Sequence, residues 1–182
     1  MADLAFSTLI PLAQADSAEV ELVLDRAFGA DRRGRTAYKI RAGTEWLPAL
    51  SFAALDEHEA LAGTIQAWPV ALTLVGGEGH ARAHPLIMVG PVAILPERQG
   101  QGFGRALMAA QKEAIEAGVE EGAPPLPQVL IGDEPYYGKF GFTQAPRGWN
   151  CPGPWEPERL LVRMLSPVGP PPDGMLGPWL TQ

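Results

Sequence analysis

The feature that most constrains the fold is an apolar run that leads through a glycine-rich loop into helix-forming residues. Residues 86–95 read LIMVGPVAIL, and residues 98–110 read RQGQGFGRALMAA. The run is too short to cross a membrane as a helix, and its Gly90–Pro91 step disfavours a core helix. We therefore expect a buried strand at residues 86–95, followed by a loop and a helix.

The helix that follows the loop predicts a site for an anion. Phe103, Leu107 and Ala110 recur at helical spacing and share one face. The N–H groups of a first helical turn have no partner within the helix, and the helix contributes about half a positive charge there. Glycines let the main chain approach phosphate oxygens and adopt positive φ. The sequence therefore predicts that main-chain amides of this loop bind a phosphate.

Two common phosphate-binding loops do not fit the residues. A P-loop needs Lys followed by Ser or Thr after its last glycine, whereas Gly104 is followed by Arg105 and Ala106. The dinucleotide fingerprint needs G-x-G-x-x-G, whereas GQGFG gives G-x-G-x-G. The sequence thus favours neither nucleotide hydrolysis nor dinucleotide binding.

The pattern that fits is Gln-x-x-Gly-x-Gly at Gln99, Gly102 and Gly104. Within VGPVAILPERQGQGFGRALM it resembles the acyl-CoA loop of the GNAT superfamily of N-acyltransferases. Downstream, YYGKFGF at residues 136–142 is similar to the family's Tyr-x-x-x-Gly-Phe segment. The resemblance extends over residues 5–166, and AFGADRRGRTAYKIR also resembles the early helical region of the family.

The order of the predicted elements and the resemblance imply an α/β fold. We expect a central mixed, mostly antiparallel sheet with a splayed central strand pair and flanking helices. The strands are predicted at residues 7–12, 49–55, 60–72, 86–95, 128–131 and 159–165. DEHE at residues 56–59 predicts a hairpin turn between the second and third strands, and residues 75–85 form a glycine-rich connection. The helices are predicted at residues 16–28, 31–43 and from residue 103, with a helical turn inside 134–142. We expect one domain at residues 1–167 and an irregular, proline-rich tail at residues 168–182.

The resemblance implies acetyl-CoA as the acyl donor and no metal. The loop would hold the pyrophosphate, with the guanidinium of Arg98 or Arg105 as a further contact. Gly90–Pro91 favours a bulge that separates its strand from residues 128–131, so that the pantetheine arm pairs with residues 92–94. The amide near Ile94 would polarise the thioester carbonyl. The implied cofactor-binding residues are Val92, Ala93, Ile94, Gln99, Gly100, Gly102, Phe103, Gly104 and Arg105.

The implied reaction is attack of a neutral amine on the thioester. An alkyl amine has a pKa near 10.4, so only about one in a thousand is neutral at pH 7 and a base helps. Asp133, Glu134 and His84 are candidates for that base. Tyr137 matches the family's tyrosine, which serves as the acid for the departing thiolate, and Tyr136 is the alternative.

Composition limits the partners of the chain. The net charge of −7 argues against nucleic acid and mildly favours a cationic acceptor. We expect a primary amine acceptor, either a small molecule or a protein amine, and leave a homodimer open. The single Cys151 rules out an intramolecular disulfide. With no signal peptide and no 18-residue apolar stretch recognised, we expect a cytoplasmic protein without membrane contact.

Two questions stay open at this point. Trp149 and Trp155 either wall the acceptor pocket or pack under the proline-rich segment around them. The chain could also be a non-catalytic module that binds acyl-CoA, or an unrelated α/β domain that binds none.

Overall fold

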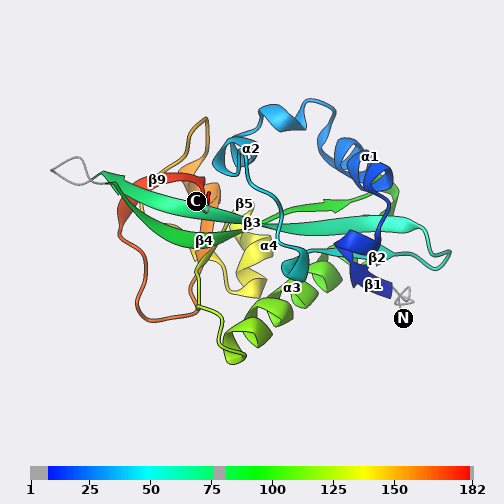
Figure 1. Cartoon of the computed structure of the whole chain (residues 1–182). Coiled ribbons are helices and arrows are strands. Elements are labelled where there is room, and N and C mark those ends of the chain that lie inside the picture. The colour runs from blue at the N-terminus through cyan, green and yellow to red at the C-terminus, as the bar shows by residue number, and fades with distance from the viewer. Residues whose placement is uncertain (1–7, 76–80, 181–182) are drawn as a thin grey trace. The chain divides into compact units, whose positions relative to one another are not determined.

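The computed structural model describes residues 8–75 and 81–180, which form two compact units. The first unit comprises Met1–Arg33, Trp46–Ala67 and Gly90–Ala123. The second comprises Gly34–Glu45, Trp68–Val89 and Pro124–Gln182. Two long strands, β3 (Leu61–Val75) and β4 (Ala81–Ile94), run along the chain from one unit into the other (Figure 1). Residues 76–80 of the predicted glycine-rich connection, and residue 7 of the first predicted strand, lie outside the described residues.

The first unit is built on three antiparallel strands. β1 (Thr8–Pro11) pairs with β2 (Phe52–Leu55), and β2 pairs with the beginning of β3. Ala53 belongs to the apolar cluster that α1 (Ser17–Phe28) covers, whereas its neighbour Ala54 pairs with Gly63. Since successive side chains of a strand point to opposite faces, α1 and α3 (Phe103–Glu120) cover opposite faces of these strands, with Leu107 of α3 beside Gly63.

The predicted hairpin between β2 and β3 is present, and Asp56 closes it. The Asp56 carboxylate accepts hydrogen bonds from the N–H groups of His58 (2.9 Å) and Ala60 (3.0 Å). Glu59 adopts a φ of 61°, in the left-handed region. Aspartate suits position 56 because its short side chain can accept hydrogen bonds from the backbone of its own turn.

The second unit contains two groups of strands. β4 pairs in parallel with β5 (Gln128–Ile131), β5 pairs antiparallel with β8 (Leu160–Arg163), and β8 pairs antiparallel with β6 (Thr143–Gln144). The end of β3 pairs antiparallel with β9 (Asp173–Pro178), which pairs in parallel with β7 (Gly148–Asn150). A core of buried side chains joins these strands to α2 (Thr36–Ile40).

The pairing between β4 and β5 is short. Ile87 pairs with Gln128 and Met88 with Val129, and Leu130 and Ile131 then pair with β8 alone among the described residues. The Gly90–Pro91 peptide bond that follows on β4 is cis. The prediction of a mixed, mostly antiparallel sheet with a splayed central pair and flanking helices is therefore confirmed.

The short elements complete the order. They are the single helical turns η1 (Leu12–Gln14), η2 (Arg32–Gly34), η3 (Pro48–Leu50), η4 (Pro96–Arg98), α4 (Glu134–Tyr137), η5 (Gly138–Phe140) and η6 (Pro157–Arg159). The helix predicted at residues 31–43 is broken into η2 and α2, because Gly34 is a poor helix residue and Arg35 is extended.

The sequence predicted an irregular tail at residues 168–182, and this prediction is wrong. β9 lies inside residues 168–182, with Leu176 fully buried opposite Leu72. The prolines and glycines around it hide the alternation that marks a strand, so the local pattern did not predict it. The division into one domain and a tail stays a prediction.

We expect Asp16→Ala to lower the free energy of unfolding by about 1 kcal/mol. The Asp16 carboxylate caps α1 by accepting from the N–H groups of Ala18 (2.9 Å) and Glu19 (3.0 Å), and alanine offers no acceptor. Urea unfolding measures the loss, and Asp16→Asn, which keeps an acceptor oxygen, serves as the control. An equal loss in both variants would contradict the capping role.

Candidate functional site

The first turn of α3 has no side-chain cap among the residues that the structure describes. Gly102 is the N-cap residue and has no side chain to offer the turn, and the turn itself contains no acidic residue. The first helical hydrogen bond runs from the Ala106 N–H to the Gly102 carbonyl (3.0 Å). The N–H groups of Phe103, Gly104 and Arg105 precede that bond and have no acceptor within the helix. These are the N–H groups at which the sequence predicts an anion site, and that site stays a prediction.

The first turn of α1, unlike that of α3, is stabilised by acidic side chains. Its first turn is capped by the Asp16 carboxylate and carries Glu19 as well. Both negative groups complement the positive end of the helix dipole. α3 is the longer helix and lacks both, so its positive end is available to an anion from outside.

Glycine is required at positions 100 and 102 by the backbone conformation and not by a lack of space. Gly100 and Gly102 have φ angles of 77° and 92°, which disfavour any residue with a side chain. A Cβ atom at either position would meet nothing within 4 Å. The same left-handed turn therefore leaves open space beside the amides. Phe103, which is 1% exposed, fixes the start of the helix in the core.

Arg98 is held by acidic residues of the β2–β3 hairpin. Its guanidinium donates to Asp56 (2.5 Å) and to Glu57 (3.2 Å). Burial raises the pKa of Asp56, but the N–H groups of His58 and Ala60, together with Arg98, lower it by more. Arg98, a predicted phosphate contact, thus serves as a brace between the hairpin and the loop.

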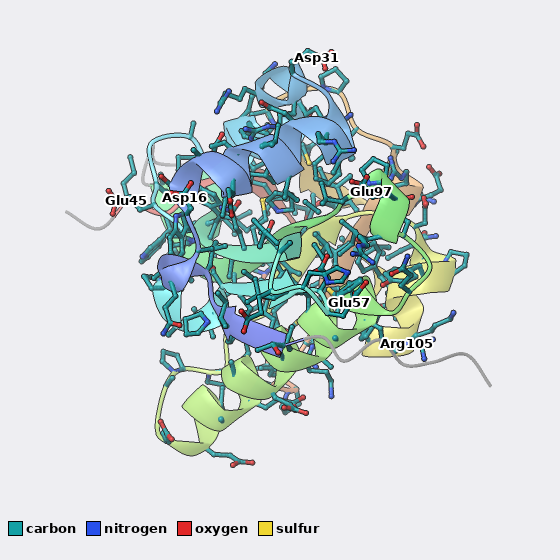
Figure 2. The ribbon with its side chains drawn as sticks, turned by 90° about the vertical axis from the view of Figure 1, so that its right-hand side faces the viewer. Asp16, Asp31, Glu45, Glu57, Glu97 and Arg105 are labelled. Atoms are coloured by element: carbon teal, nitrogen blue, oxygen red, sulfur yellow. The ribbon has the colours of Figure 1, made fainter. Side chains whose placement is uncertain are left out.

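A second ion pair holds the other side of the same segment. Arg26 of α1 donates to both carboxylate oxygens of Glu97, at 2.7 and 2.8 Å. The Gln101 side-chain amide donates to the Glu97 carbonyl (3.1 Å). Figure 2 shows Glu57, Glu97 and Arg105 toward one side of the ribbon and Asp16 toward the other. The turn from residue 96 to residue 101 is therefore tied to α1 and to the hairpin.

The predicted pantetheine strand is the last part of β4. Ala93 is buried in the cluster under α1, while Val92 and Ile94 are half-buried. Gly63 makes room for this segment, since a Cβ at that position would lie 2.8 Å from the Ala93 carbonyl oxygen. Residues 92–94 and the loop residues from Gln99 to Arg105 belong to the first unit.

Tyr137 belongs to the second unit and is half-buried at the end of α4. Its ring meets the edge of Tyr136, with 4.9 Å between centroids, and packs against Phe142 at 6.4 Å. Burial raises the pKa of Tyr137 to about 12, helped by Tyr136 and Asp133 and opposed by Arg159. The phenol is therefore protonated at neutral pH and able to donate a proton.

The three candidates for the base differ in their partners. Asp133 forms an ion pair with Arg159 (3.1 Å), and Glu134 accepts a hydrogen bond from Gln144 (3.1 Å). His84 lies on β4 with a buried Nε2 that has no hydrogen-bond partner among the described residues. The two carboxylates are engaged in local structure, whereas this imidazole nitrogen is not.

Other side chains that the sequence singled out are structural. Trp149 is 2% exposed, and its indole N–H donates to the Pro171 carbonyl (2.9 Å). Trp155 packs against the same core. Cys151 is buried there too, and burial raises the pKa of its thiol to about 11, so it is no nucleophile at neutral pH. Trp149 therefore packs in the core instead of walling a pocket.

The described residues contain neither a candidate metal site nor a membrane-spanning helix. Within residues 8–75 and 81–180, no three His, Cys, Asp or Glu side chains gather as a metal site would require. No helix in these ranges is long and apolar enough to cross a membrane.

Two features of the site were missed by sequence reasoning. The DEHE turn predicted a hairpin, but nothing local indicated that Asp56 would pair with Arg98, 42 residues later. Gly132, which directly follows β5 and lies against Tyr137, carried no motif.

Comparisons with known proteins agree on one family. A family model described as an acetyltransferase (GNAT) domain matches residues 49–144, more than half of the chain. A GNAT family acetyltransferase from Brucella melitensis, solved with acetyl-CoA, is 26% identical with a TM-score of 0.59, over 93% of this chain and 94% of that one. A comparison with the curated proteins finds no match.

Two more distant structures share the fold. YhbS from Escherichia coli, a GNAT family N-acetyltransferase solved with CoA, is 22% identical with a TM-score of 0.64, over 96% of this chain and 89% of that one. PH1933 from Pyrococcus horikoshii is 14% identical with a TM-score of 0.53, over 88% and 99%.

We expect Arg98→Gln to destabilise the protein more at pH 7 than at about pH 3, because protonation of Asp56 progressively removes the ion pair as the pH falls below its ordinary pKa of 3.8. A carboxylate whose folded pKa is lowered stabilises the fold above its unfolded pKa, and this contribution is lost as the pH falls through the folded pKa. Asp56 is such a group, and Arg98 is among the causes of its lowered pKa. Urea unfolding of both proteins at the two pH values checks this. A pH-independent difference would contradict the ion-pair explanation.

Proposed function

The chain belongs to the GNAT family of acetyltransferases, and from this premise we propose that it transfers the acetyl group of acetyl-CoA to a primary amine. The observation that carries the proposal is the uncapped first turn of α3 behind the Gly100–Gly102 turn. The relative from Brucella melitensis, solved with acetyl-CoA, supports the choice of ligand.

The loop holds the pyrophosphate of the coenzyme. The N–H groups of Phe103, Gly104 and Arg105, with those of Gly100 and Gly102, donate to its oxygens. Gln99 leads the chain into this turn and is exposed. Since Arg98 is bound to Asp56 and Glu57, the remaining guanidinium for a phosphate contact is that of Arg105.

The acyl-bearing arm runs along the end of β4. Pantetheine carries amides, which pair with an extended backbone as an added strand would. Val92, Ala93 and Ile94 supply that backbone. The amide near Ile94 donates to the thioester carbonyl and stabilises the oxyanion that forms during attack.

The reaction exchanges a C–S bond for a C–N bond. The neutral amine attacks the carbonyl carbon, the C–S bond breaks, and the amine nitrogen gives up a proton to a base. Tyr137 gives its proton to the departing thiolate, whose ordinary pKa is about 8.5. Among Asp133, Glu134 and His84 the base stays open, and His84 is the one with a nitrogen that has no partner among the described residues.

The acceptor is a primary amine, of a small molecule or of a protein. Its ammonium form is drawn to a chain of net charge −7 and must lose a proton before it reacts. Thiol release from acetyl-CoA against a panel of amines, followed by mass spectrometry of the products, tests the proposal. Coenzyme binding without thiol release for any amine would leave a binding module in its place.

We expect Gly102→Ala to weaken CoA binding by about tenfold, because alanine at a left-handed position costs about 1–2 kcal/mol and displaces the amides. Isothermal titration measures the affinity. Gly122→Ala is the matched control, since Gly122 has a φ of 105° at the other end of α3 and equally open surroundings. Equal affinities in the two variants would rule out the loop as the pyrophosphate site.

We expect Tyr137→Phe to reduce kcat by about 100-fold and to leave the KM for acetyl-CoA almost unchanged, because only the proton donor is lost. Tyr136→Phe, which keeps the neighbouring ring, is the control. The chain has three tyrosines, so an alkaline absorbance titration of both proteins isolates the one that ionises near a pKa of about 12. A larger loss of kcat in Tyr136→Phe would transfer the role to Tyr136.

A further inference from the structure

We propose that Gly132 is a positioning residue for the proton donor, because the Tyr137 ring occupies the space that any side chain at position 132 would fill. The inference rests on the proposed function, in which Tyr137 is the acid. Gly132 directly follows β5 and is buried.

The fit between these two residues is tight. A Cβ atom built on Gly132 would overlap Cε2 of Tyr137 and lie 2.7 Å from its Cδ2 atom. The same atom would lie 3.2 Å from Cδ1 of Leu130. Carbon atoms pack at about 3.5–4.0 Å, so even a methyl group forces the ring to move.

The backbone of Gly132 is fixed, which is why the ring must be the part that moves. The Gly132 N–H donates to the Arg159 carbonyl (2.8 Å) and extends the β5–β8 ladder beyond the Ile131–Leu160 pair. The φ angle of Gly132 does not lie in the left-handed region. Alanine is therefore acceptable to the backbone, and the requirement for glycine is purely steric.

Other contacts confine the ring to this position. Tyr136 meets it edge-on at 4.9 Å, and Phe142 lies on another side at 6.4 Å. The Asp133 carbonyl accepts from the N–H groups of Tyr136 (3.1 Å) and Tyr137 (3.0 Å), and the Asp133 carboxylate pairs with Arg159. A ring pushed away from Gly132 therefore moves toward solvent.

This movement has a readout separate from activity. Burial is the first cause of the raised pKa of Tyr137, followed by Tyr136 and Asp133, with Arg159 opposing. Gly132→Ala leaves all three of these neighbours in the chain and reduces the burial of the phenol. The pKa of Tyr137 then falls from about 12 toward its ordinary value of 10.

The test compares two identical substitutions in the full chain. Gly132→Ala is expected to lower kcat by about tenfold or more, with the KM for acetyl-CoA within about twofold of the original value. Gly138→Ala is the control, because Gly138 is six residues away, has a φ of −58° and has nothing within 4 Å of an added Cβ. It is expected to change neither kcat nor the tyrosine titration.

A double variant separates positioning from a general effect on the fold. In the Tyr137→Phe background the ring is still displaced but no proton donor is present, so Gly132→Ala should change kcat by less than about twofold. An equal loss of kcat in both backgrounds, or an unshifted titration of Tyr137 in Gly132→Ala, would overturn the inference. Failure of Tyr137→Phe to lower kcat would overturn the acid role, while the titration would still report the position of the ring.

Stability gives a further test if Gly132→Ala unfolds. Shortening Tyr137 to alanine removes the atoms that collide with the added methyl group. Gly132→Ala should then cost clearly less unfolding free energy in the Tyr137→Ala background than in the original chain. Equal costs would show that the Tyr137 ring is not what excludes a side chain, and the inference would fail.

Discussion

The structure depends on the way α3 begins, with no side-chain cap from any part of the chain that the structure describes. In most helices a side-chain oxygen at the N-cap accepts from the first turn, and the N-cap backbone is extended. Gly102 is instead left-handed, at φ 92° and ψ 0°, and has no side chain. The conformation that turns the chain from β4 into α3 thereby removes the residue types that would cap the helix. The N–H groups of Phe103, Gly104 and Arg105 therefore have no capping side chain at Gly102, as the proposed pyrophosphate site requires.

Such a turn needs support, because glycines lose more conformational entropy on folding than other residues. The support comes from outside the loop. Glu97 is held by Arg26 of α1, and Arg98 by Asp56 and Glu57 of the hairpin. The basic residue next to the loop thus stabilises the shape of the site, and the main chain provides the donors. Arg98 can therefore flank the proposed phosphate site and still be bound to carboxylates.

The sequence predicted the elements whose signals are local. The helical spacing from Phe103 to Ala110 matched α3, and the short apolar segment QVLI matched β5. The glycine pattern matched the turn in which Gly100 and Gly102 have positive φ. The fold class followed from their order and from the resemblance to one family.

What the sequence did not predict depends on contacts between distant segments. Arg98 could equally have faced a phosphate, and only the folded hairpin shows that it faces Asp56. β9 forms because Leu176 finds a buried place opposite Leu72, despite flanking residues that are typical of loops. Gly132 carries no motif, since its role comes from a ring five positions away that folds back over it. Packing of this kind leaves no periodic signal in a chain.

Glycine has different roles in the proposed binding of the pyrophosphate and in the proposed proton donation by Tyr137. At Gly100 and Gly102 the space around the missing side chain is open, and the backbone angle is what other residues cannot adopt. At Gly132 the backbone angle is ordinary and the space is filled by a ring. In the first case the absence of a side chain exposes donors to a phosphate. In the second it gives the Tyr137 ring a confined, buried position, from which the phenol is proposed to donate its proton to the thiolate.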